Sequence, residues 1–195
     1  MFKQPLVYLL LAVSLPAAAL AADVEAGKKL YPTCVACHGP DAEGIAALNS
    51  PPLAGQSATY MIRQLWDFKK GNRGDGDCDT IGAQMQAIAM TLTDGEAIAN
   101  VAAYLGSLPP SNPAATIEAD AAHGQELYDS RCGACHGGEG WGNEALYTPK
   151  LNGIGDWYLV RQVQNFQTGL RGNLKDAPHG QQMSMMAKSV TTDEL

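Results

Sequence analysis

Cys34-Val35-Ala36-Cys37-His38, followed at once by Gly39, is the stretch on which the organisation of this chain depends. Two cysteines separated by two residues, with a histidine directly after the second, form the attachment signature of c-type haem. Each thiol forms a thioether with one haem vinyl group, and the histidine imidazole binds the iron from one side. The stretch therefore predicts one covalently bound haem.

The same motif returns 98 positions later as Cys132-Gly133-Ala134-Cys135-His136. The shift continues to match residues well beyond the motif, without a gap. The matched pairs include Pro51 and Pro149, Tyr60 and Tyr158, Arg63 and Arg161, Gln64 and Gln162, Arg73 and Arg171, and Met85 and Met183. A register held over this distance indicates a tandem duplication, and so predicts two haems.

The segment 109–115 separates the two copies and contains three prolines. Prolines at this density prevent a continuous helix and suit an extended linker. We therefore expect one domain at 23–108 and a second at 116–195.

Residues 1–21 have the pattern of a signal peptide. Lys3 gives a positive start, Leu6 to Leu15 is mostly apolar, and small residues follow at 19–21. A membrane anchor is the alternative, but the apolar run is short for a span. We expect cleavage after export and a periplasmic mature protein, soluble or peripherally associated with the membrane. The formal charge of −7 argues against nucleic acid or anionic lipid as a partner and permits steering toward a basic protein surface.

Both domains are expected to be all-α. Asp23 can cap a helix that runs toward the first motif. Residues 56–70 place Met61, Leu65 and Phe68 on one face of a second helix. Thr93 begins a capping box for a third helix, which an apolar stripe continues to Leu105. No segment shows the alternation of a strand.

A methionine opposite the histidine is one recognised way to ligate haem iron. Three methionines follow each motif within its domain, and only Met85 and Met183 coincide in the repeat. We therefore predict axial pairs His38–Met85 and His136–Met183. Pro51 and Pro149 follow the motifs in Pro-Xaa-Leu-Xaa-Gly stretches. They are compatible with a turn, and also with a carbonyl that accepts the second imidazole N–H.

Other polar residues leave alternatives open. Tyr60, Arg63, Tyr158 and Arg161 can reach haem propionates or form an ordinary helix face with solvated arginines. Cys78 is the cysteine left over once the haems have used four, and is expected to be a loop thiol. His123 is expected on the surface just before a helix. His179 lies four residues before Met183 and competes for iron only if that methionine dissociates, a role against which its counterpart Ile81 argues.

With both motifs, both methionines and the repeat in view, the chain resembles the class I cytochromes c, and most of all the dihaem cytochromes of the c4 kind. The resemblance implies haem thioethers at Cys34, Cys37, Cys132 and Cys135. It also implies electron transfer in the periplasm, from a quinol-oxidising complex to a terminal oxidase or another reductase.

The second domain departs from the family in one respect. In domain 1 a helix follows Glu96, but the counterpart of Glu96 is Glu194, and the sequence stops at Leu195. The C-terminal helix that in this family crosses the N-terminal helix is thus missing from domain 2. Either the sequence is truncated or the domain is incomplete, and we expect domain 2 to unfold before domain 1.

Three functions are compatible with these residues. A mobile electron carrier, not itself an enzyme, needs both irons six-coordinate, which the matching methionines favour. A haem subunit of a periplasmic dehydrogenase, such as a flavoprotein or an enzyme that oxidises sulfur compounds, would have the same ligands. A dihaem enzyme would need one open iron and hence an asymmetry in ligands, which the repeat does not show. A cysteine-based metal or dithiol site is the least favoured alternative, because a histidine adjoins each cysteine pair.

Overall fold

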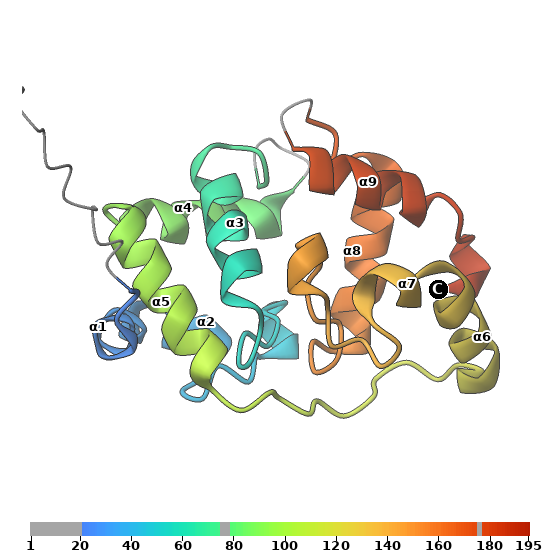
Figure 1. The fold of residues 1–195 in the computed structure, drawn as a ribbon, viewed down its shortest axis with the longest axis horizontal. Helices are drawn as coiled ribbons and strands as arrows, with labels where there is room; N and C mark the ends of the chain where they lie inside the picture. The colour runs from blue at the N-terminus through green and yellow to red at the C-terminus, as the bar shows by residue number, and fades with distance from the viewer. Residues whose placement is uncertain (1–20, 75–78, 175–176) are drawn as a thin grey trace, which may run out of the picture.

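A computed structural model describes residues 21–74, 79–174 and 177–195 of the chain. The expected signal peptide, up to residue 20, and Cys78 lie outside these ranges. The described chain forms two helical lobes joined by an extended segment (Figure 1). Extended pairing within these ranges is limited to two isolated bridges, Ile45–Ser50 and Asn143–Thr148. The all-α, two-domain architecture predicted from the repeat is confirmed.

The two domains repeat the same order of elements up to the last helix of domain 1. Domain 1 contains α1 (Val24–Leu30), α2 (Pro32–His38), η1 (Ala46–Leu48), α3 (Ala58–Lys69), α4 (Thr80–Thr91) and α5 (Gly95–Ser107). Domain 2 contains α6 (Ala121–Arg131), α7 (Gly133–His136), η2 (Glu144–Leu146), α8 (Asp156–Thr168), α9 (Pro178–Ala187) and η3 (Thr192–Glu194).

Helix starts follow the local sequence, with one correction. The carboxylate of Asp23 accepts hydrogen bonds from the first amides of α1, as predicted. For α5 the predicted cap Thr93 is wrong, because Asp94 Oδ1 accepts the Ala97 N–H at 2.8 Å. Thr93 instead donates its hydroxyl to the Asp94 carboxylate. The charged carboxylate of Asp94 is the stronger acceptor and therefore caps the helix in place of Thr93.

The core of domain 1 forms where α5 crosses α1. Gly27 marks the crossing, and a Cβ there would overlap the backbone oxygen of Asn100. The Asn100 side chain accepts the Asp23 N–H at 2.7 Å, and the rings of Tyr31 and Tyr104 lie 5.4 Å apart. The glycine therefore allows two helices to approach closely enough to bury the residues between them.

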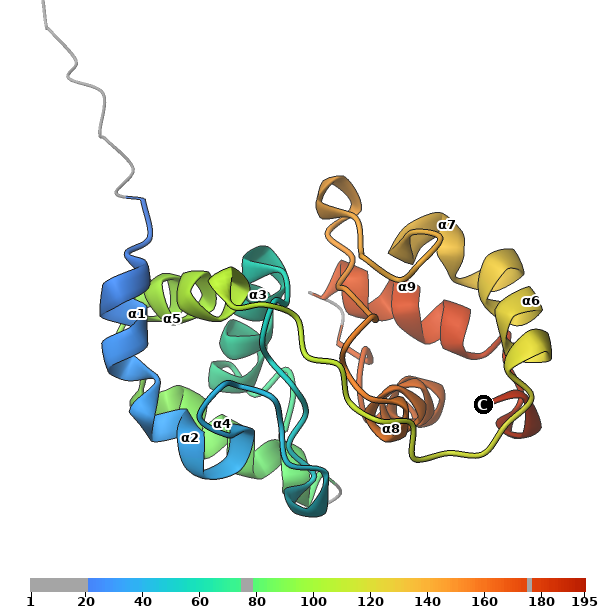
Figure 2. The same cartoon turned by 90° about the horizontal axis from the view of Figure 1, so that it is seen from below.

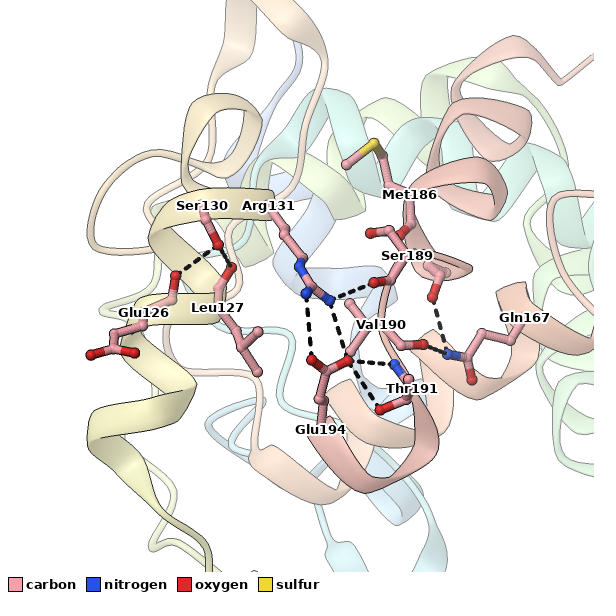
Figure 3. A network of polar contacts seen from close by, with 11 residues as sticks. Glu126, Leu127, Ser130, Arg131, Gln167, Met186, Ser189, Val190, Thr191 and Glu194 are labelled. Carbon is pink, nitrogen blue, oxygen red and sulfur yellow. Dashed lines mark hydrogen bonds and ion pairs between the residues drawn. The ribbon is translucent and has the colours of Figure 1, made fainter.

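The matching helix of domain 2, α6, contains no buried residue. Within the described chain no helix follows η3, and a Cβ on Gly124 would meet no atom within 4 Å beyond the adjacent backbone of its own helix. Figure 3 shows what holds the end of α6: Arg131 donates to the carbonyl of Ser189 and forms an ion pair with Glu194 at 3.2 Å. Such a half-exposed pair contributes roughly 1 kcal/mol or less.

The linker is fastened to both domains (Figure 2). On the domain 1 side, Pro110 of the linker packs against Gly55, where a Cβ would lie 2.8 Å from the Pro110 Cα. On the domain 2 side, just after the linker, the Asp156 carboxylate accepts the amides of Thr116 and Ile117 at 2.6 and 2.8 Å. Burial raises the pKa of Asp156, but these and the other hydrogen bonds to its carboxylate together outweigh burial and lower the pKa to about 2.

None of the described helices is both long and apolar enough to cross a membrane.

Candidate functional site

Each cysteine motif forms a short helix that ends at its histidine. Pro32 begins α2, where its missing N–H costs nothing, and Gly39 ends the helix with φ = 81°. Gly137 ends α7 in the same conformation. This left-handed turn allows the chain to fold back over the histidine. As a result His38 and His136 are buried, with 4% and 8% of their surface exposed.

The buried histidines are held in one tautomer. His38 Nδ1 lies 2.9 Å from the Pro51 carbonyl oxygen, and His136 Nδ1 lies 3.0 Å from that of Pro149. Since a carbonyl can only accept, Nδ1 carries the proton and Nε2 presents a free lone pair. Burial lowers the pKa of both rings, and the carbonyl bond opposes this only in part. Both imidazoles are therefore neutral and suited to bind a metal through Nε2.

The cysteines occupy matching environments in the two domains. The first cysteine of each motif is half-buried and the second is exposed, and none of the four forms a disulfide with another described cysteine. Burial raises the pKa of Cys34 and of Cys132. Among the described residues no three His, Cys, Asp or Glu side chains cluster in a way that could hold a metal ion.

A cavity of about 350 Å³ lies beside the first motif and fits an apolar cofactor with an acidic edge. Cys34, Cys37 and His38 line it on one side, and Met85 of α4 also lines it. The remaining lining is largely apolar, with a polar end formed by tyrosine, glutamine and arginine side chains. Thiols, a neutral imidazole, a thioether and cationic groups together match the parts of haem c.

The structure separates the methionines by environment. Met85 lines the cavity together with Met61, whereas Met90 is 59% exposed. In domain 2, Met183 is half-buried on α9, and Met185 and Met186 are exposed. Of the three methionines on α9, Met183 is thus the least exposed to solvent, and it is also the one selected by the repeat.

Four long side chains lie where the two domains meet, namely Tyr60, Arg63, Tyr158 and Arg161. From the sequence they could either contact haem propionates or face solvent. Arg63 donates to the Tyr147 carbonyl at 3.0 Å, and its counterpart Arg161 donates to the Asn49 carbonyl at 3.0 Å. Tyr158 accepts from Arg73, and Tyr60 accepts from Arg171, at 2.8 and 2.9 Å. All four therefore contact the opposite domain.

An arginine–glutamine ring lies at the centre of this interface and was not predicted. It consists of Arg73, Arg171, Gln64 and Gln162. Arg73 donates to the side-chain oxygens of Gln64 and Gln162, both at 3.0 Å. Arg171 donates to the same two oxygens at 2.5 and 2.8 Å. The sequence signal for the ring was that the glutamine and the arginine both recur in the repeat. Nothing in that recurrence revealed that each arginine also bonds to the glutamine of the opposite domain.

The remaining candidates have no contact with the cavity described above. His123 is exposed, but it lies inside α6 and not before it, which corrects the predicted position. His179 is half-buried against the Tyr147 ring, 5.4 Å between centroids. Burial and the nearby Arg63 lower the pKa of His179.

Comparison with known proteins agrees with this geometry. The family model for cytochrome c matches twice, at residues 24–109 and 121–195. Cytochrome c4 of Azotobacter vinelandii is 35% identical over 88% of this chain and 85% of its own length. A thiosulfate dehydrogenase electron acceptor from Stutzerimonas stutzeri is 36% identical over 83% of this chain and 74% of its own length.

A solved structure shows the same architecture. Reduced recombinant cytochrome c4 from Pseudomonas stutzeri superimposes with a TM-score of 0.71 at 30% identity, covering 89% of this chain and 94% of that one. Together with the double family match, this likeness accounts for both domains and for their tandem order. The chain belongs to the cytochrome c family, as a two-domain member similar to cytochrome c4.

Proposed function

We propose that the chain is a periplasmic electron carrier with two covalently bound haems c. The haems would be attached at Cys34 and Cys37 and at Cys132 and Cys135. When bound, each haem supplies an iron centre that exchanges one electron. The protein accepts electrons from a quinol-oxidising complex and donates them to a terminal oxidase or another reductase.

The observation that carries this proposal is the state of the two histidines. Both Nδ1 atoms donate to a proline carbonyl, so both Nε2 atoms are free to bind iron. Their burial excludes water from that side. We assign Met85 and Met183 to the opposite side, supported by the repeat and, for Met85, by its place in the cavity with His38. With one histidine and one methionine held by each iron, a bound haem would exchange electrons and would have no site left for a substrate.

An optical redox titration with carbon monoxide tests the assignment. The reduced protein should show two low-spin haems that do not bind carbon monoxide. Met85→Ala should open one haem to the ligand, and Met183→Ala the other. Met61→Leu is the matched control, because Met61 lines the same cavity and its repeat counterpart is Leu159. Carbon monoxide binding by the unmodified protein would instead indicate an open iron and a dihaem enzyme.

A second candidate is a dedicated haem subunit or acceptor for a periplasmic dehydrogenase. The similarity to a thiosulfate dehydrogenase electron acceptor favours it. The reduction rate with a purified thiosulfate-oxidising enzyme, compared with that of a quinol-oxidising complex, separates the two functions. A stable complex with the dehydrogenase in gel filtration, together with faster reduction by it, would support the dedicated acceptor.

A further inference from the structure

The cavity beside the first motif is completed by the other domain. Besides Cys34, His38 and Met85, its lining includes several residues of domain 2. These are Ile154, Tyr158, Arg161, Gln162, Asn165 and Leu170. All but Leu170 belong to α8 or lie just before it, so one helix of domain 2 forms part of the wall of the site in domain 1.

The arginine–glutamine ring attaches that wall firmly. Gln64 and Gln162 are 9% and 8% exposed, and each side-chain oxygen accepts from both guanidiniums. Moving either arginine therefore disturbs an acceptor in its own domain and one in the other. The bonds form a closed cycle with approximate two-fold symmetry, so neither half can adjust alone.

The ring carries two positive charges against neutral acceptors. Among the described residues, neither Arg73 nor Arg171 lies within ion-pair distance of a carboxylate. The Asp67 carboxylate reaches the ring indirectly, by accepting from Gln64 at 3.1 Å, and Asp79, which lines the cavity, acts on Arg73 through its charge without forming an ion pair. Both guanidiniums lower the pKa of Tyr60, against the effect of its burial. Two half-buried cations that share neutral acceptors favour an anion nearby, and the acidic edge of a haem in this cavity would supply one.

We propose that the two haem sites are shared across the domain boundary, so that side chains of α8 help to set the reduction potential of the haem in domain 1. By the symmetry of the ring, Tyr60 and Gln64 of α3 do the same for the haem in domain 2. This inference rests on the proposed function, since it presupposes two bound haems. Gln162 and Tyr158 are positioning residues, which act through Arg73 and Arg171.

The sign of the effect follows from electrostatics. Gln162 offers a partial negative charge that offsets both guanidiniums, and leucine would remove it while keeping a similar volume. The uncompensated positive charge then favours the reduced haem, so the potential rises. Removing a cation with Arg73→Gln acts in the opposite direction and lowers the potential. Both variants should affect both haems, because each of these side chains bonds to ring members of both domains.

Gln162→Leu in the full haem-loaded chain is the test, with the potential of each haem followed by NMR of its methyl resonances. The haem at Cys34 and Cys37 should show a higher ratio of reduced to oxidised form at a fixed potential, by several-fold. Gln164→Leu is the matched control. It makes the same change on the same helix at an exposed position outside the cavity, and should leave both haems unchanged.

A shift confined to the haem at Cys132 and Cys135 would overturn the shared site. If Gln162→Leu does not take up haem, Tyr158→Phe replaces it, because phenylalanine keeps the ring and removes the oxygen that accepts from Arg73. It should raise the potential of the domain 1 haem by a smaller amount, and no change there would equally overturn the proposal. The unmodified protein separates this failure from failure of the proposed function, which would appear as a missing haem or as carbon monoxide binding.

Discussion

At the crossing of α1 and α5 in domain 1, Gly27 lies against the backbone of Asn100, whereas the equivalent Gly124 of α6 has open space around it. Buried apolar residues are distributed in the same way among the described parts of the domains. Domain 1 contains Tyr31, Ala42, Ala54, Met61, Phe68, Ala89, Ile98, Val101, Ala102 and Leu105, and domain 2 contains Ile154, Phe166 and Ala187. The two domains therefore share the parts that face the histidine and the interface, and differ at their outer ends.

The comparison shows how much of the core one returning helix provides. Four of the ten buried apolar residues of domain 1 belong to α5 itself, namely Ile98, Val101, Ala102 and Leu105. In domain 2 the motif helix, the histidine bond and α9 form without such a helix. The local geometry at the histidine therefore depends on the turn at Gly137 and the Pro149 carbonyl, and less on the size of the core.

The largest expected difference is in the local stability of α1 and α6. Amide protons of α6 should exchange with solvent at least about a hundredfold faster than those of α1 in the intact haem-loaded chain, because α6 buries no residue. Hydrogen exchange with peptide-resolved mass spectrometry measures both helices in one sample. Equal protection of the two helices would show that domain 2 is stabilised by something other than its described core.

The paired glycines provide the next test. Gly27→Ala should destabilise domain 1 by about 2 kcal/mol or more, because the added methyl group overlaps the Asn100 backbone. Gly124→Ala should stabilise domain 2 by about 0.5–1 kcal/mol, since alanine is the better helix former and meets no atom there. Urea unfolding of both variants checks the signs, and destabilisation by Gly124→Ala would show that another helix covers α6.

The linker bond of domain 2 predicts a pH dependence that domain 1 lacks, since the counterpart of Asp156 is Ala58. The pKa of Asp156 is lowered to about 2, so its contribution is complete above the ordinary pKa near 4 and is lost as the pH falls toward 2. Asp156→Asn should cost about 1 kcal/mol at pH 7 and flatten the stability profile in that window.

Unfolding of Asp156→Asn and of the unmodified chain at pH 6, 4 and 2.5 measures this effect. Ser57→Ala is the control, because Ser57 caps α3 of domain 1 without a charge. It should lower stability equally at each pH. A profile for Asp156→Asn parallel to that of the unmodified chain would contradict the predicted linkage.

The smallest expected effect concerns the C-terminal ends of α4 and α9, the helices that carry Met85 and Met183. Lys69 Nζ donates to the carbonyl of Leu92 after α4, and Gln167 occupies the equivalent place after α9, donating to Val190. A cation near a helix C-terminus is stabilising. Lys69→Gln should therefore cost about 0.5 kcal/mol, and Gln167→Lys should gain a similar amount at low salt. Urea unfolding at two salt concentrations checks whether the difference is electrostatic, since an effect insensitive to salt would point to packing.

Much of this fold could be predicted because its signals are local. The order of Cys34, Cys37 and His38 specifies the motif, the prolines at 109–115 specify the linker, and the repeat aligns the domains without a gap. The assignment of Thr93 as a cap was wrong because two adjacent acceptors competed, and their order of strength depends on backbone geometry. The haem ligands themselves stay predictions.

The interface could not be predicted, although all its residues were in view. Tyr60, Gln64 and Arg73 recur in domain 2, and that recurrence is equally compatible with bonds inside each domain. Whether Arg73 reaches Gln162 depends on how the domains are oriented, which no pattern within one copy records. Only the three-dimensional arrangement distinguishes the crossed bonds from the uncrossed ones.

The crossed arginine–glutamine ring also has a consequence for assembly. Arg73 of domain 1 contacts Gln162 of domain 2, and Arg171 of domain 2 contacts Gln64 of domain 1. Such reciprocal contacts are the rule at an interface between two identical subunits. Here both partners belong to one polypeptide, so their association is intramolecular. A short connection sets an effective concentration on the order of millimolar, whatever the amount of protein present. The paired state is thus independent of dilution.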